Sequence, residues 1–227
     1  MTAAPTSSLS LRERKKLRTR QALIDTALEL FTERGFGGVT LDELCEAVEV
    51  SKRTFFRNFT SKEDVAMAPE QDLWRAFLEE LETAVPDGLP LVELGRDALL
   101  AALDRMADEG WARRVLLSRR LAERTPSMAA HGLQFCEATT REALEILHRR
   151  FGLGGGGDVR PRLAVDMLIA AHRCAVAGWV ARVPDGADEA VVTAPPAARE
   201  LAARLREAVA ALPGSLALSA VPGAERG

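Results

Sequence analysis

Apolar residues in the first part of the chain recur with the spacing of amphipathic helices. Four of them follow the i, i+3, i+4, i+7 pattern of one helical face: Ile24, Ala27, Leu28 and Phe31. The pattern predicts a helix from about Leu11 to Arg34. Gly35 follows directly, and a glycine in this place commonly ends a helix because it adopts a left-handed conformation without strain.

Capping residues predict three further helix starts after Gly35. They are marked by the capping box Thr40–Glu43, by Ser51 after a tight turn, and by the pair Ser61–Asp64. The second and third helices are short, and the fourth extends to about Val85.

Long amphipathic segments separated by glycine and proline follow beyond Pro86. They predict helices at about 90–109, 111–123, 127–151, 161–183 and 195–212. The Gly154–Gly157 run has no Lys-Ser/Thr after it, so it is expected to be a connector rather than a phosphate-binding loop. Residues 1–10 and 213–227 are expected to be a disordered arm and a flexible tail.

Composition adds a preference for an all-α fold. Aromatic residues make up 5% of the chain and tyrosine is absent, so alanine, leucine and valine must fill the core. Residues 1–62 carry 11 basic and 8 acidic side chains, whereas the remainder carries 19 and 25. This asymmetry indicates an anion-facing first segment on an acidic body.

Cysteine spacing and hydropathy exclude several classes of protein. Cys45, Cys136 and Cys174 are far apart, so we expect reduced thiols, no metal site and no cofactor. The most apolar long stretch, 163–183, contains Asp166 and other charged residues that do not suit a lipid-facing span. We expect a cytoplasmic protein that does not bind membranes.

The three helices before residue 65 predict a helix-turn-helix, because a tight turn separates the second and third. Phe55 and Phe59 would bury one face of the third helix. Its other faces carry short or cationic side chains that suit bases and phosphates: Lys52, Arg53, Thr54 and Arg57. The basic run from Arg12 to Arg20 would lie along a phosphate backbone or, alternatively, form a solvated arm.

Three strings resemble the DNA-binding domain of the TetR family of bacterial regulators: Ala27–Phe36, Val39–Leu44 and Val50–Asp64. The resemblance implies a DNA-binding set consisting of Arg18, Thr40, Ser51, Lys52, Arg53, Thr54, Phe56, Arg57, Asn58 and Lys62. Within it, Thr40 and Ser51 would donate to phosphates, and Lys62 would hold another phosphate. Phe56 stands where the family usually has tyrosine, so one phosphate hydrogen bond is lost.

The resemblance also implies a helical effector-binding and dimerisation domain over residues 66–212, after a DNA-binding domain at 11–65. Helices 161–183 and 195–212 would form the homodimer interface. Five apolar or small residues lie at helical spacing, and the small ones allow close helix approach: Leu163, Met167, Ala171, Ala175 and Gly178. A core helix in a monomer is the alternative reading of that pattern.

An effector is expected in this second domain. Residues 111–151 are similar to mycofactocin-type regulators of the family, which implies an acyl thioester or a similar amphipathic molecule. Candidate pocket residues combine an apolar body with, in most cases, a polar tip: Trp74, Trp111, His131, Phe135, His172 and Trp179. Each of them could instead be ordinary core.

The expected function is that of a homodimeric repressor that a small, largely apolar effector releases from a palindromic operator. The same architecture could instead activate transcription. Two alternatives from other classes are a ligand-binding or partner-binding protein that has lost DNA recognition and an α-helical enzyme. The enzyme reading has no nucleophile–base pair, metal cluster or phosphate loop behind it, so we expect no catalysis.

Overall fold

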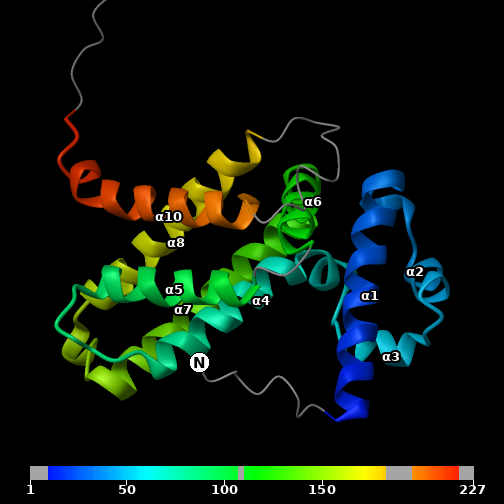
Figure 1. Cartoon of the computed structure of the whole chain (residues 1–227), viewed down its shortest axis with the longest axis horizontal. Helices are drawn as coiled ribbons and strands as arrows, with labels where there is room; N and C mark the ends of the chain where they lie inside the picture. The colour runs from blue at the N-terminus through cyan, green and yellow to red at the C-terminus, as the bar shows by residue number, and fades with distance from the viewer. Residues whose placement is uncertain (1–9, 107–109, 183–195, 220–227) are drawn as a thin grey trace, which may run out of the picture. The chain divides into compact units, whose positions relative to one another are not determined.

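The computed structural model describes residues 10–106, 110–182 and 196–219, with the side chains of 196–198 excepted. Within these residues the chain forms helices and turns and no strand, which confirms the all-α class (Figure 1). The α-helices are α1 (Leu11–Arg34), α2 (Leu41–Ala47), α3 (Lys52–Phe56), α4 (Lys62–Thr83), α5 (Leu91–Met106), α6 (Trp111–Arg124), α7 (Pro126–Phe151), α8 (Arg160–Val180) and α10 (Pro196–Ser215). Two short 3-10 helices are η1 (Phe36–Gly38) and η2 (Gly155–Gly157).

Several predicted ends differ from the structure: α4 ends at Thr83 rather than at Val85, and α8 ends at Val180 rather than at residue 183. Ser10 was assigned to a disordered arm, but it caps α1, because its Oγ accepts a hydrogen bond of 3.2 Å from the Glu13 N–H. Helix α10 continues to Ser215, past the predicted end at residue 212. Residues 1–9, residues 220–227 and the predicted helix start at 195 lie outside the described residues.

The chain divides into two compact units. Unit 1 comprises residues 1–72 and 113–135, and unit 2 comprises residues 73–112 and 136–227. Helices α4, α6 and α7 therefore each contribute residues to both units. The division within α4 falls after Asp72, whereas the sequence placed a domain boundary after residue 65.

Unit 1 has a core built around the three-helix head. Ile24, Ala27, Leu28 and Phe31 of α1 are buried, as their spacing predicts. The core also includes residues that lie far away in the sequence, since Met128 of α7 is fully buried in the same cluster. Parts of α6 and α7 thus complete the hydrophobic core of the head.

Ion pairs attach α6 to the other helices of unit 1. Arg114 lies 3.6 Å from Asp25 of α1, and its own side chain is 11% exposed. Arg119 pairs with Glu70 of α4. The sequence alone gave no sign of these pairs, because the partners are separated by long stretches of chain.

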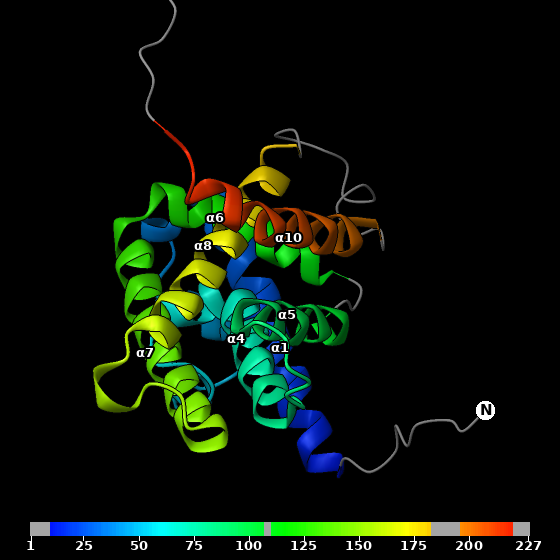
Figure 2. The same cartoon turned by 90° about the vertical axis from the view of Figure 1, so that its left-hand side faces the viewer.

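Unit 2 is organised around α8, which packs against both α5 and α10 (Figures 1 and 2). A Cβ atom built on Gly95 of α5 would lie 2.8 Å from Leu168 Cδ2 of α8. The glycine therefore lets α5 approach α8 closely. By length and composition α8 could cross a membrane, but it carries Asp166 and Arg173, and ten of its residues are buried in this unit.

Of the five α8 residues expected at a dimer interface, Leu163 is exposed and Met167 and Gly178 are half-buried. Ala171 and Ala175, which were expected at a dimer interface, are each 3% exposed and belong to the core of unit 2. The exposed small and apolar residues are Leu163, Ala170, Cys174 and Ala177. They lie on one side of the helix, because their spacings of seven, four and three residues follow the helical period.

Candidate nucleic-acid interface

Helix α3 is fixed by its cap and by two aromatic side chains. The Ser51 Oγ accepts a hydrogen bond of 3.1 Å from the Thr54 N–H, which confirms the predicted N-cap. Phe55 is fully buried and Phe59 is 3% exposed, and their ring centroids lie 5.8 Å apart. The two rings hold one face of α3 against the core of unit 1.

The predicted base-reading cations lie on the outer surface of α3. The side chains of Arg53 and Arg57 are exposed, and neither forms an ion pair or hydrogen bond with any described residue. Lys52 pairs with Asp42 at 2.7 Å, and the hydrogen bond to Asp42 raises the pKa of Lys52. Because both partners are exposed, the pair is screened by solvent and Lys52 can exchange Asp42 for a phosphate.

The capping hydroxyls differ in what they can offer a phosphate. Thr40 Oγ1 donates its one proton to Glu43 Oε2 at 2.8 Å, so it has none left to donate. Ser51 and Thr54 lie 3.1 Å apart through their hydroxyls, and one donates to the other. The second hydroxyl of this pair keeps its proton, and both lie at the N-terminus of α3.

Glu43 connects the cap of α2 to α1. It accepts hydrogen bonds from Arg34 and from the Thr40 N–H, the latter at 2.8 Å. The hydrogen bond from Arg34 is the main cause that lowers the pKa of Glu43 to about 2, and the bonds from Thr40 add to it. The carboxylate therefore stays ionised and keeps the capping box closed at neutral pH.

Phe56, which replaces the usual tyrosine, and Asn58 of the expected DNA-binding set have different surroundings. Phe56 is 56% exposed and packs edge-on against Phe55, with ring centroids 5.5 Å apart. Asn58 is half-buried and donates through Nδ2 to the Thr54 carbonyl at 2.8 Å. The Asn58 amide thus closes the end of α3 instead of extending outward.

Lys62 does not occupy the position expected of a phosphate ligand. Its Nζ donates to the carbonyl oxygens of Phe36 at 2.8 Å and Val39 at 2.5 Å. The same ammonium group lies 4.7 Å from the centroid of the Phe36 ring. Lys62 therefore binds the connection between α1 and α2, and the expectation that it holds a phosphate is corrected.

Arg18 lies on the exposed first part of α1, as expected of a DNA contact. Arg20, two residues further, is turned inward instead. It forms two hydrogen bonds to Asp72, of 2.6 and 2.8 Å, and its guanidinium lies 5.0 Å from the centroid of the Phe59 ring. Arg20 therefore joins α1, the end of α3 and α4.

The six predicted effector residues do not all belong to one unit. His131 and Phe135 are in unit 1, where His131 Nε2 lies 3.1 Å from Gln71 Nε2. The other four are buried in unit 2: Trp74, Trp111, His172 and Trp179. Of these, Trp74 and His172 are in contact, with ring centroids 5.0 Å apart.

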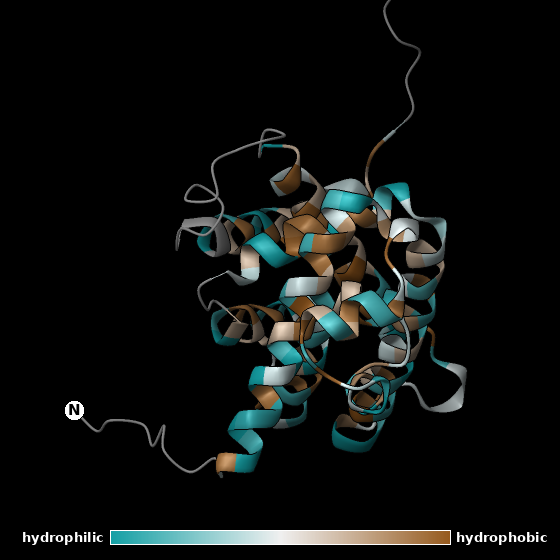
Figure 3. Cartoon of the chain, turned by 90° about the vertical axis from the view of Figure 1, so that its right-hand side faces the viewer, coloured by the Kyte–Doolittle hydropathy of each residue, from teal (hydrophilic) through white to brown (hydrophobic). Residues whose placement is uncertain are grey.

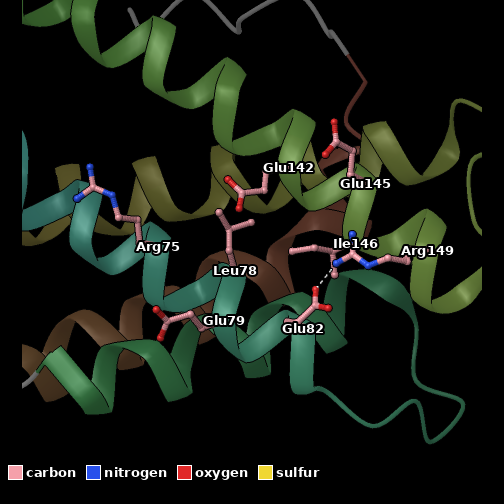
Figure 4. Close-up of a pocket in the computed structure, with 8 residues that line it drawn as sticks. All are labelled: Arg75, Leu78, Glu79, Glu82, Glu142, Glu145, Ile146 and Arg149. Atoms are coloured by element: carbon pink, nitrogen blue, oxygen red, sulfur yellow. Dashed lines mark hydrogen bonds and ion pairs between the residues drawn. The ribbon is translucent and has the colours of Figure 1, made fainter.

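A cleft that the sequence analysis missed lies between α4 and α7 in unit 2 (Figure 4). Its volume is about 460 Å³, and it is lined by Arg75, Leu78, Glu79, Glu82, Glu142, Glu145, Ile146 and Arg149. Glu82 and Arg149 pair across it at 2.6 Å. The sequence analysis assigned these charged residues no role, because nothing in their spacing shows that α4 and α7 face each other. Four carboxylates against two guanidinium groups make the cleft acidic.

The sequence of this chain is similar to those of known regulatory proteins. The model of the bacterial regulatory proteins of the tetR family matches residues 23–68. The HTH-type transcriptional regulator TcmR of Streptomyces glaucescens is 38% identical over 178 residues, covering 76% of this chain and 77% of that protein. The putative mycofactocin biosynthesis transcriptional regulator MftR of Mycobacterium tuberculosis is 27% identical over 169 residues, covering 74% and 82%.

A solved structure shows the same fold. The fatty acid degradation regulator FadR from Bacillus halodurans superposes with a TM-score of 0.53 at 18% sequence identity, covering 87% of this chain and 96% of that one. These matches confirm the resemblance carried by Ala27–Phe36, Val39–Leu44 and Val50–Asp64, including the relation to a mycofactocin regulator. The chain belongs to the TetR family of DNA-binding transcriptional regulators.

Proposed function

We propose that the chain is a homodimeric repressor that inserts α3 into the major groove of a palindromic operator. The observation that carries the proposal is the outward direction of Arg53 and Arg57, opposite the buried rings of Phe55 and Phe59. Arginine forms paired hydrogen bonds with guanine in the major groove. The hydroxyl proton left over on Ser51 or Thr54 and the exchangeable Lys52 would supply phosphate contacts.

The homodimer would form through α8 and α10. The exposed stripe of α8, including Ala170 and Ala177, is small enough for a partner helix to approach closely. Helix α10 adds Ala203 and Ala210, which are also exposed. The two α3 helices of the dimer would then bind two half-sites whose centres are separated by one turn of the DNA helix, or by a whole number of turns.

The effector would be a small, largely apolar molecule, with an acyl thioester as the candidate class, bound in unit 2. Support comes from the buried aromatic residues there, including Trp74, Phe77 and His172. The acidic cleft between α4 and α7 does not suit the anionic groups of a coenzyme A thioester, so we do not place the effector there. The regulator would act in the cytoplasm, at the chromosome.

Selection of duplexes from a random-sequence library by the full-length protein tests DNA recognition. We expect a palindromic motif, with affinity that falls steeply as salt rises because phosphate contacts release counterions. Failure to enrich any motif would refute the operator proposal and favour a protein that binds only ligands or partners. Release of the selected duplex by an acyl-coenzyme A, with free coenzyme A as the control, tests the effector class.

A further inference from the structure

The first eight residues of α1 form a helical extension, residues 11–18, on which every residue is exposed. Leu11 is 77% exposed and Leu17 is 53% exposed, whereas the first buried residue of the helix is Leu23. Figure 3 shows the first turns of α1 mostly in hydrophilic colours, with brown bands where apolar residues stand. The extension therefore does not contribute to the core of unit 1.

The extension concentrates positive charge. It carries five cations and one carboxylate: Arg12, Glu13, Arg14, Lys15, Lys16 and Arg18. Glu13 Oε2 accepts hydrogen bonds of 2.8 and 2.7 Å from the N–H and hydroxyl of Ser10, and the hydroxyl bond is the main cause that lowers the pKa of Glu13. None of the five cations forms an ion pair with a described residue. Glu13, the one carboxylate within residues 11–18, is thus used by the cap.

This arrangement is unfavourable for an isolated helix. Arg12 and Lys16, and likewise Arg14 and Arg18, are like charges four residues apart, which lie side by side on a helix and repel each other. Arg12 and Arg14 also lie in the first turn, at the positive end of the helix dipole. An anionic surface alongside would remove both penalties.

The extension lies close to the proposed reading helix. Arg20 contacts the ring of Phe59, three residues beyond α3, so α1 passes the end of α3 at this point. Figure 1 shows α3 beside the N-terminal half of α1. Arg12 is eight residues before Arg20, which is about 12 Å along the helix axis. That distance corresponds to about 3–4 base pairs of duplex at about 3.4 Å each.

We propose that residues 11–18 form a second DNA-contacting surface, which binds backbone phosphates flanking the half-site read by α3. The inference rests on the proposed function and adds to it a contact outside the segment that the family model matches, which begins at residue 23. The charge of the surface fits a phosphate backbone, and its position next to α3 selects duplex DNA over other polyanions.

The test compares an Arg14→Gln/Arg18→Gln variant with the wild-type protein on the selected duplex. One duplex carries flanks of about 8 base pairs beyond the motif, and the other carries flanks of about 2 base pairs. On long flanks we expect the slope of log affinity against log salt to become shallower by about 1.8 per protomer, since each lost phosphate contact contributes about 0.9. On short flanks the two proteins should bind equally.

An Arg141→Gln/Arg160→Gln variant is the matched control, because both arginines are exposed in unit 2 and the loss of net charge is the same. It should keep the wild-type slope on both duplexes. Equal slopes for the extension variant and the wild type on long flanks would overturn the inference while leaving the proposed function intact. Loss of motif selection by an Arg53→Gln/Arg57→Gln variant tests the proposed function separately.

Discussion

The ammonium group of Lys62 lies 2.5 Å from the main-chain carbonyl oxygen of Val39, which places a cation from the start of α4 directly against the connection between α1 and α2. The same group reaches the Phe36 carbonyl and the Phe31 and Phe36 rings. Phe36 is the first residue of η1 and Val39 is its C-cap, so both carbonyls belong to the short segment between α1 and α2. Lys62 therefore holds together the segment that leads into α2.

Replacement of Lys62 by methionine should lower the free energy of unfolding by about 2 kcal/mol, since it removes a charged donor from two carbonyls and a cation from two rings. Urea unfolding measures the loss. The salt slope of DNA binding should stay at its wild-type value, because Lys62 is not a phosphate contact. Lys52→Met, at an exposed cation, should leave stability unchanged. A shallower dependence of DNA affinity on salt for Lys62→Met would instead show that Lys62 contacts a phosphate.

Arg53→Ala or Arg57→Ala should reduce discrimination between the selected duplex and single-base variants by about 1–3 kcal/mol, if the replaced arginine reads a guanine. Competition binding with a panel of base substitutions measures this directly. Arg141→Ala is the control, because that arginine is exposed in unit 2. An unchanged ranking of the panel would assign the arginine to the phosphate backbone.

The pKa of Glu43 predicts a specific acid sensitivity. Its folded value of about 2 lies below the ordinary value of 4.5, so its stabilising contribution is complete above pH 4.5 and is lost as the pH falls toward 2. Melting temperatures measured across this range should fall less steeply for Glu43→Gln than for the wild type. Glu46→Gln, at an exposed position on the same helix, should follow the wild-type curve.

Ala177→Glu should convert the dimer to a monomer, because it puts a charge on the exposed small-residue face of α8. Sedimentation measures the change. The variant protomer should fold normally, since Ala177 does not contribute to the core of unit 2. Ala138→Glu, at an exposed alanine of α7, should remain dimeric. If both variants stay dimeric, the interface lies elsewhere.

Local signals in the sequence were sufficient for the helices of the head. The bounds of α1 and the caps at Thr40 and Ser51 were predicted correctly, because each depends on residues within one or two turns. The direction of Lys62 was not, since it depends on carbonyls more than twenty residues away. Long-range contacts of this kind leave no periodic pattern in the chain.

For the helices of unit 2, the sequence predicted their existence but not which of their faces are exposed. Their existence followed from periodicity, but Ala171 and Ala175, which were expected at a dimer interface, are buried. Helix α8 has small or apolar residues on nearly every side, so its pattern does not distinguish a core-facing side from a partner-facing side. The cleft between α4 and α7 was missed for a related reason, because glutamates on two separate helices carry no sign of being neighbours.

The positions of the tryptophans have a practical consequence. Trp74, Trp111 and Trp179 all lie in unit 2, and the chain has no tyrosine. Tryptophan emission therefore comes from unit 2 alone, because the aromatic residues of the head that carries α3 are phenylalanines. Any change in emission on adding a duplex must be transmitted from one unit to the other. The protein thus contains a native, label-free reporter of communication between its two units.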